Sequence, residues 1–328
     1  MTFCVKSCAR GWFFLLAAIV SLSAMLNAKA YALDKKASFA LTHFILAGMF
    51  ERMGDRGRAI QEYKESLKAD YQNPVIHAKL ALSYVKESEF AKAVTELNTA
   101  VRLQPEAVEP HAILALLYSA QGKLELARSE YEAALKNASY LQPQNIEIYK
   151  SLAEVYLQQK RYPEAENTYK LILKLSPGDA EAHFYLGNVY DNLKNRPAAE
   201  EEIQKALQSK PDYSEALNYL GYLYIEENKE LAQAETLIKK ALEIEPENGA
   251  YVDSLGWLYF KQGKVNEAVK VLEKATFLLK DPVIYDHLGD AYFKTGDAEN
   301  AKLNWQESLK LEPGQEKIKG KLERLNKN

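Results

Sequence analysis

Apolar and polar positions along most of the chain follow the spacing of paired amphipathic helices, and this pattern repeats about every 34 residues. Alanines at successive intervals of 34, 34, 38, 34, 35, 34 and 33 residues mark the period: Ala59, Ala93, Ala127, Ala165, Ala199, Ala234, Ala268 and Ala301. In the first repeat Leu46 lies thirteen residues before the marker alanine, and Phe50 follows that leucine by four. The leucine and aromatic slots recur in every repeat, with one residue inserted in the sixth. Residues four apart share one face of a helix, so the pattern predicts two helices in each repeat.

Small residues and prolines occupy their own slots in the same period. The residue after the leucine is alanine in the first four repeats and glycine in the last four, which predicts a close approach of two helices there. In five repeats a proline lies twelve residues after the marker alanine, where it would end the second helix: Pro105, Pro177, Pro211, Pro246 and Pro313. These slots resemble those of the tetratricopeptide-repeat family from about Ala40 to Gln315. The resemblance implies an all-α fold, a right-handed solenoid of stacked helix-turn-helix repeats.

The period divides residues 40–315 into eight repeats. Their approximate bounds are 40–73, 74–107, 108–145, 146–179, 180–213, 214–248, 249–281 and 282–315. The interval of 38 adds four residues near Ser139 to Asn145. This is about one helical turn, so we expect one lengthened helix there. Residues 316–328 carry Ile318, Leu322 and Leu325 on one helical face and predict a capping helix that covers the last repeat.

The N-terminal residues have the order of charged, apolar and small residues that is typical of an export signal. Lys6 and Arg10 precede an uncharged stretch of 18 residues, and Ala30-Tyr31-Ala32 fits a cleavage site. We expect residues 1–32 to be a signal peptide and residues 33–39 a short linker. An uncleaved N-terminal membrane anchor is the alternative. Either form predicts an exported protein, in the periplasm or on the outer face of the inner membrane.

Composition and charge narrow the classes of function. The 328 residues include 42 Lys+Arg and 45 Asp+Glu, a formal net charge of −3, which disfavours a general nucleic-acid binder. Subtracting the positive charges of Lys6, Arg10 and Lys29 with the signal leaves the mature chain at −6. Cys4 and Cys8 would leave with the same segment. The mature chain would then have no cysteine for a disulfide, a thiol nucleophile or a metal site.

No motif predicts catalysis, and we expect a protein that is not an enzyme and that holds no cofactor or metal. Histidines occupy one slot, three residues before the structural leucine, in four repeats: His43, His77, His111 and His183. Packed helices lie about 10 Å apart, too far for histidines of different repeats to share one metal ion. We interpret these histidines as packing residues between repeats, and His287 lies alone in the last repeat. The segment from Gly256 to Lys264 lacks the spacing and the Ser/Thr of a phosphate-binding loop.

Function is expected on the inner wall of the solenoid, which the first helices line. Positions at i, i+4 and i+7, off the leucine face, predict an aromatic and acidic strip in repeats five to eight. The candidate peptide-binding residues of this strip are Phe184, Asn188, Asn218, Tyr222, Asp253, Trp257, Phe260, Asp286 and Asp290. We predict that the strip binds a basic or aromatic-containing polypeptide, because aromatic residues in partly dry pockets often dominate binding energy. The alternative is that these residues only brace the groove.

The family resemblance adds expectations about partners. It implies a protein or peptide partner and a role for Asn188 in bonding the ligand backbone. The family's basic clamp for acidic tails is absent, since Lys150 is followed by Glu154. No nucleic-acid partner is expected, and membrane contact only through an uncleaved N-terminal segment.

The segment from Tyr251 to Leu309 is similar to the C-terminal repeats of exported bacterial tetratricopeptide proteins. We therefore expect an exported, non-enzymatic scaffold that helps assemble a cell-envelope complex. The alternative is a regulatory subunit of an envelope enzyme in the cell-wall or polysaccharide machinery.

Overall fold

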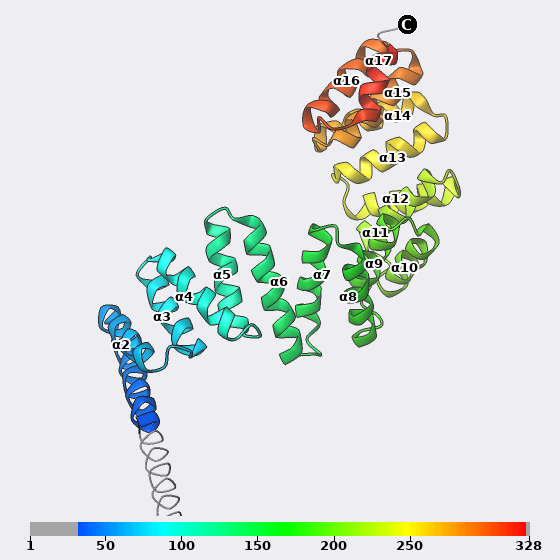
Figure 1. Cartoon of the computed structure of the whole chain (residues 1–328). Helices are drawn as coiled ribbons and strands as arrows, with labels where there is room; N and C mark the ends of the chain where they lie inside the picture. The colour runs from blue at the N-terminus through cyan, green and yellow to red at the C-terminus, as the bar shows by residue number, and fades with distance from the viewer. Residues whose placement is uncertain (1–31, 326–328) are drawn as a thin grey trace, which may run out of the picture. The chain divides into compact units, whose positions relative to one another are not determined.

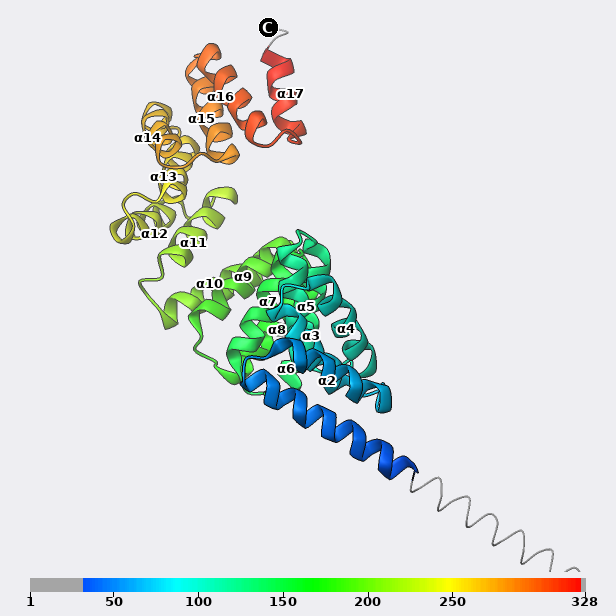
Figure 2. The same ribbon diagram turned by 90° about the vertical axis from the view of Figure 1, so that its left-hand side faces the viewer.

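The computed structural model describes residues 32–325, and every regular element in that range is an α-helix. The chain divides into two compact units, Met1–Pro143 and Gln144–Asn328. The first unit holds a helix over residues 32–52, then α2 (Arg56–Ala69), α3 (Pro74–Lys86), α4 (Phe90–Leu103), α5 (Val108–Ala120) and α6 (Leu124–Leu141). The second holds α7 (Ile146–Gln158), α8 (Tyr162–Leu175), α9 (Ala180–Asn192), α10 (Arg196–Ser209), α11 (Ser214–Glu226), α12 (Leu231–Ile244), α13 (Gly249–Lys261), α14 (Val265–Leu278), α15 (Pro282–Thr295), α16 (Ala298–Leu311) and α17 (Glu316–Leu325). Figures 1 and 2 show the helices following one another as hairpin pairs within each unit, which confirms the all-α repeat prediction for the described residues.

Side chains just before the first helices set where these helices begin. The side-chain oxygens of Asn73, Asn145 and Asn248 accept hydrogen bonds from backbone N–H groups in the first turns of α3, α7 and α13. Asp179 and Asp281 do the same for α9 and α15. Each cap satisfies a donor that has no partner within the helix, so the start of a repeat is encoded locally.

The turn inside each helix pair holds a residue with a left-handed backbone. These residues are Gly54, Ser88, Gly122, Lys160, Lys194, Asn228, Gly263 and Gly296, with φ between 52° and 89°. The turn between α11 and α12 holds a second one, Glu230, with φ of 49°. Glycine adopts this conformation freely, whereas the other residues do so at a cost. The turn geometry is therefore common to all eight pairs although the residue type varies.

Small side chains allow the helices of a pair to approach closely, as the sequence predicted. All eight marker alanines are buried. A Cβ atom added at Gly187 would lie 2.7 Å from Cδ1 of Ile203, and one at Gly256 would lie 2.6 Å from Cγ of Leu272. These distances are below van der Waals contact, so only glycine fits without a shift of the facing side chain.

The lengthened helix expected from the interval of 38 residues is α6. It has 18 residues, whereas each of the other second helices has 14. It is also the last helix of the first unit. Its Tyr131 is 44% exposed, whereas Tyr63 in the same slot of α2 is 2% exposed.

The two ends of the described chain are helical. Residues 33–39, expected as a linker, belong instead to the helix over 32–52, because no proline or glycine interrupts this segment. At the other end Ile318 of α17 is buried against Ala301 and Trp305 of α16, with Leu322 and Leu325 beside it. Residues 1–31 of the predicted signal peptide and residues 326–328 of the predicted cap lie outside the described residues. Within the described part, no helix combines the length and the apolar character needed to cross a membrane.

Candidate functional site

Two residues of the predicted strip, Asp253 and Trp257 on α13, lie inside the fold. The Asp253 carboxylate is 7% exposed, and both its oxygens lie 3.0–3.1 Å from Nδ1 of His287 on α15. The Trp257 ring stacks on His287 at 4.0 Å and on Phe260 at 4.8 Å, and its Nε1–H donates to Glu226. Asp253 and Trp257 thus brace the second unit, which leaves little of either side chain for a partner.

The other acids of the strip, Asp286 and Asp290 on α15, bind a lysine of the capping helix. Nζ of Lys321 lies 2.6 Å from an oxygen of each carboxylate. Trp305 also donates its Nε1–H to Asp290, and the Lys321 ammonium lies 5.7 Å from the centre of the Trp305 ring. Burial raises the pKa of Asp290, although the hydrogen bond from Lys321 opposes this shift. This end of the strip already holds a cationic side chain within the chain itself.

The remaining strip residues are half-buried and lie on α9 and α11, except Phe260, which lies on α13. Phe184 packs among Tyr185, Tyr213 and Tyr219, with ring centroids 5.1–5.9 Å apart. Burial, with the charges of Glu226 and Asp253, raises the pKa of Tyr222 to about 12. The prediction that these residues bind a partner stays a prediction.

Two asparagines complete the strip. Asn188 accepts a hydrogen bond from Asn192 through both its backbone and its side-chain oxygen. The side-chain oxygen of Asn218 is buried and has no hydrogen-bond partner among the described residues. The expected role of Asn188 in bonding a ligand backbone stays a prediction.

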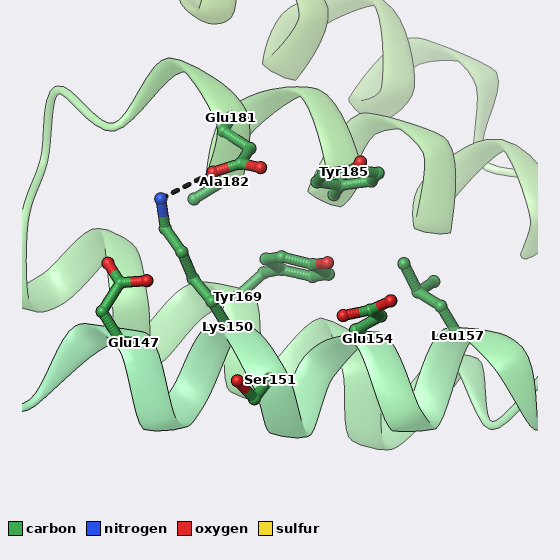
Figure 3. A pocket seen from close by; sticks show the side chains of 9 residues that line it. All are labelled: Glu147, Lys150, Ser151, Glu154, Leu157, Tyr169, Glu181, Ala182 and Tyr185. Carbon is green, nitrogen blue, oxygen red and sulfur yellow. Dashed lines mark hydrogen bonds and ion pairs between the residues drawn. The ribbon is translucent and has the colours of Figure 1, made fainter.

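A pocket of the second unit lies between α7 and α9 (Figure 3). Its volume is about 290 Å³. In Figure 3 the α7 side chains line one side, the α9 side chains face them, and Tyr169 of α8 lies between the two helices. The lining residues are Glu147, Lys150, Ser151, Glu154, Leu157, Tyr169, Glu181, Ala182 and Tyr185. We call this the α7–α9 pocket.

Two tyrosines form the aromatic part of the α7–α9 pocket. The rings of Tyr169 and Tyr185 are 5.8 Å apart at an interplanar angle of 18°. Tyr169 is 4% exposed. Burial raises the pKa of both hydroxyl groups, and the nearby charges of Glu154 and Glu181 raise them further, so both phenols are neutral at physiological pH.

The pocket carries a net negative charge. Glu147 and Glu154 are exposed along α7, and Glu181 faces them from α9. The one cation of the lining, Lys150, binds Glu181 at 2.6 Å and Asp179 at 3.0 Å. Burial lowers the pKa of Lys150, but these two carboxylates outweigh it and raise the pKa, which keeps the ammonium charged. Carboxylates therefore remain in excess around the tyrosine rings.

The repeated histidines form hydrogen bonds within their repeats. Nδ1 of His77, His111 and His183 lies 2.6 Å from a glutamate of the second helix of the same repeat. Nε2 of each lies 2.9–3.0 Å from a backbone carbonyl six residues earlier, in the connection to the preceding repeat. His43 makes the same contact with Glu62. Among the described residues, no group of three or more His, Cys, Asp and Glu side chains has the arrangement of a metal site.

The residues of the α7–α9 pocket lie outside the predicted strip, although the same spacing extends to the fourth repeat. Applied to the fourth repeat, the i, i+4, i+7 set is Lys150, Glu154 and Leu157, and all three line the pocket. The α9 side differs, because Tyr185 follows the predicted Phe184 directly and Glu181 lies three residues before it. The rotation of α9 against α7 decides which of its neighbouring positions face the pocket, and no pattern along the chain encodes that rotation.

Comparisons with known proteins agree with the fold. The family model described as "Cilia and flagella-associated protein 70 C-terminal domain" matches residues 17–255, and the tetratricopeptide repeat model matches residues 253–276 and 283–315. RNA polymerase II-associated protein 3 of Mus musculus is 31% identical over 104 residues, which are 32% of this chain and 15% of that protein. The human protein is 27% identical over 132 residues, 39% of this chain and 19% of that protein. The chain thus spans less than a fifth of the length of these relatives.

Solved structures show the same fold at low identity. A tetratricopeptide repeat protein from Parabacteroides merdae superposes with a TM-score of 0.58 at 21% identity, over 78% of this chain and 99% of that chain. PilW, a type IV pilus biogenesis factor, gives a TM-score of 0.53 at 19% identity, over 66% of this chain and 98% of that chain. The chain belongs to the tetratricopeptide-repeat family, within which the model of the Cilia and flagella-associated protein 70 C-terminal domain describes residues 17–255.

Proposed function

We propose that this protein is a non-enzymatic scaffold that binds a polypeptide partner along the first helices of its second unit. The observation that carries the proposal is the α7–α9 pocket, whose tyrosines and carboxylates line a hollow of about 290 Å³. Half-buried aromatic side chains continue along α9 and α11. Such surfaces gain binding energy from aromatic burial and specificity from a few polar groups.

The charge of this surface supports a basic or aromatic-containing partner. Glu147, Glu154 and Glu181 surround the pocket, and its single lysine is already paired. A partner with an acidic tail would meet like charges, which is costly at close range. A partner with basic side chains would instead gain Coulomb attraction.

The N-terminal pattern of Lys6, Arg10 and the uncharged stretch supports export as part of the same proposal. Outside the cytoplasm, the scaffold would help to assemble a complex of the cell envelope. A regulatory subunit of an envelope enzyme is the alternative, and it differs in the partner: a stable, catalytically active protein.

Photo-crosslinking in the cells that make the protein tests the proposal. Benzoylphenylalanine replaces Glu154 of the pocket in one variant and Phe293, a half-exposed residue of α15, in a second. The control variant carries it at Lys270, which is exposed on the second helix α14. We expect one polypeptide to be crosslinked from positions 154 and 293 and not from 270. Equal crosslinking from all three positions, or none from the first two, would remove the proposal, and an enzyme as the product would favour the alternative.

A further inference from the structure

One tyrosine of the α7–α9 pocket is buried except at its hydroxyl group, which faces the pocket. Tyr169 is 4% exposed, yet its hydroxyl group takes part in no hydrogen bond with any described residue. Figure 3 shows this hydroxyl directed into the space between α7 and α9. A phenol group can both donate and accept a hydrogen bond, and no described residue uses either capacity here. The pocket therefore presents a polar group that a ligand can satisfy.

The acceptors around Tyr169 are spread over both walls of the pocket. One carboxylate oxygen of Glu154 accepts a hydrogen bond from Gln158. One carboxylate oxygen of Glu181 binds Lys150. Ser151 and Glu147 lie further along α7, and no described residue bonds their side chains. The ring of Tyr185 lies opposite, in the same lining. A ligand that satisfies this lining needs several donors that point in different directions and a face that packs on an aromatic ring.

We infer that the α7–α9 pocket takes the side chain of an arginine from the partner polypeptide, an inference that rests on the proposed function. The guanidinium group is planar, stacks on aromatic rings and carries five N–H donors in a fixed fork. Its plane packs on Tyr185, and its N–H groups donate to Glu154, to Glu181 and to the Tyr169 hydroxyl. A lysine ammonium is a compact point charge with three donors and serves fewer of these acceptors at once.

The same chain already holds a cation in a comparable setting at its C-terminal end. Lys321 lies between the carboxylates of Asp286 and Asp290 and near the Trp305 ring. At this end of the chain two acids on a first helix and an aromatic residue of a second helix surround a cationic side chain. In the α7–α9 pocket the aromatic residue of the second helix is Tyr169, and Lys150 already pairs with Glu181. A cation for Glu147 and Glu154 must come from outside this lining.

A peptide titration of the full chain tests the inference. The probes are capped Gly/Ser decapeptides with one central arginine, lysine or citrulline, and binding is followed by NMR line broadening of the central residue. We expect arginine to bind most tightly, lysine less tightly and citrulline, which has the same shape without the charge, not at all. Glu154→Gln and Tyr185→Leu are each expected to weaken the arginine peptide about tenfold. Glu201→Gln removes an equal charge from the outer helix α10 and should leave binding unchanged.

Circular dichroism establishes whether each variant is folded. If one of the two pocket variants does not fold, the other still tests the inference. Equal binding of the citrulline peptide, equal binding of the lysine peptide, or wild-type binding by both pocket variants overturns the inference. The proposed function fails separately. Crosslinks from position 293, together with no preference for the arginine peptide, would support the scaffold and contradict the arginine pocket. Preferred binding of the arginine peptide, with no crosslinked polypeptide, would support an arginine-binding pocket and contradict the scaffold.

Discussion

At the scale of single residues, close approach of two helices depends on the absence of a side chain. A Cβ atom added at Gly289 of α15 would lie 2.5 Å from two ring atoms of Trp305, whereas at Gly320 of α17 nothing lies within 4 Å. Close packing against Trp305 therefore requires glycine at position 289. Gly320 makes no such contact and only lowers the stability of its own helix. Identical substitutions at the two positions should therefore act in opposite directions.

We expect Gly289→Ala to lower the free energy of unfolding of the second unit by about 1–3 kcal/mol, because the indole must move out of its place. Gly320→Ala should raise it by up to about 1 kcal/mol, because alanine favours the helix. Urea unfolding followed by circular dichroism measures both. A stabilising Gly289→Ala would show that Trp305 has room to shift and that the close contact is not a constraint.

The repeated histidines show how one residue can join three segments. Nδ1 of His77 lies beside the carboxylate of Glu96, and Nε2 lies beside the backbone carbonyl of Tyr71. Both partners only accept hydrogen bonds, so both ring nitrogens must carry a proton. The hydrogen bond with Glu96 accordingly raises the pKa of His77 above its ordinary value of 6.5, against the opposing effect of burial.

Since folding raises the pKa of His77, the native state binds this proton more tightly than the unfolded chain does. Its contribution to stability is complete below pH 6.5 and disappears as the pH rises through the raised pKa. We expect His77→Gln to destabilise the first unit more at pH 6 than at pH 8.5, as measured by urea unfolding at both values. Glu96→Gln should lower the pKa of His77 in an NMR titration. An equal effect of His77→Gln at the two pH values would contradict this account.

At the scale of helices, the loss of unfolding free energy on truncating a side chain depends on whether a later helix covers that side chain. The slot four residues after the marker alanine is filled by Tyr63 in α2, which is covered, and by Tyr131 in α6, which is 44% exposed. Within the first unit no helix follows α6. The same residue type in the same slot therefore lies in two different environments.

We expect Tyr63→Ala to cost about 3–5 kcal/mol and Tyr131→Ala less than about 1 kcal/mol. The first change opens a cavity and removes the hydrogen bond to Glu51, whereas the second removes a side chain that is largely in water. Thermal unfolding of the first-unit transition in the full chain gives both values. Equal costs would mean that Tyr131 is covered in solution.

At the scale of the whole molecule, export would shorten the polypeptide that carries out the function. If the signal peptide is cleaved after Ala32, the protein recovered from its native compartment begins at Leu33, has lost both cysteines and carries a formal charge of −6. Intact-mass measurement of that material tests this expectation. A mass that includes residues 1–32 would instead support a retained anchor, and a full-length protein found in the cytoplasm would contradict export.

The sequence by itself determined the repeat, the helix pairs and the small contact residues. These properties depend on residues close together in the chain: a leucine and an aromatic four apart, a side-chain cap before five of the first helices, and an alanine or glycine where helices meet. It also predicted the extra turn of α6, because an insertion of four residues preserves the helical face. Even so, glycine marks only four of the eight left-handed turns, so the turn residue itself follows no sequence rule.

Only the tertiary structure decided which candidate residues remain available to a partner. Spacing placed Asp253 and Trp257 on the predicted strip. In the structure Asp253 is bonded to His287 of α15, and Trp257 donates a hydrogen bond to Glu226 of α11. Conversely, Tyr169 and Tyr185 face a pocket because α7 and α9 lie apart at that point. Both outcomes depend on the separation and rotation of helices that are distant in sequence, quantities that periodicity along one chain does not contain.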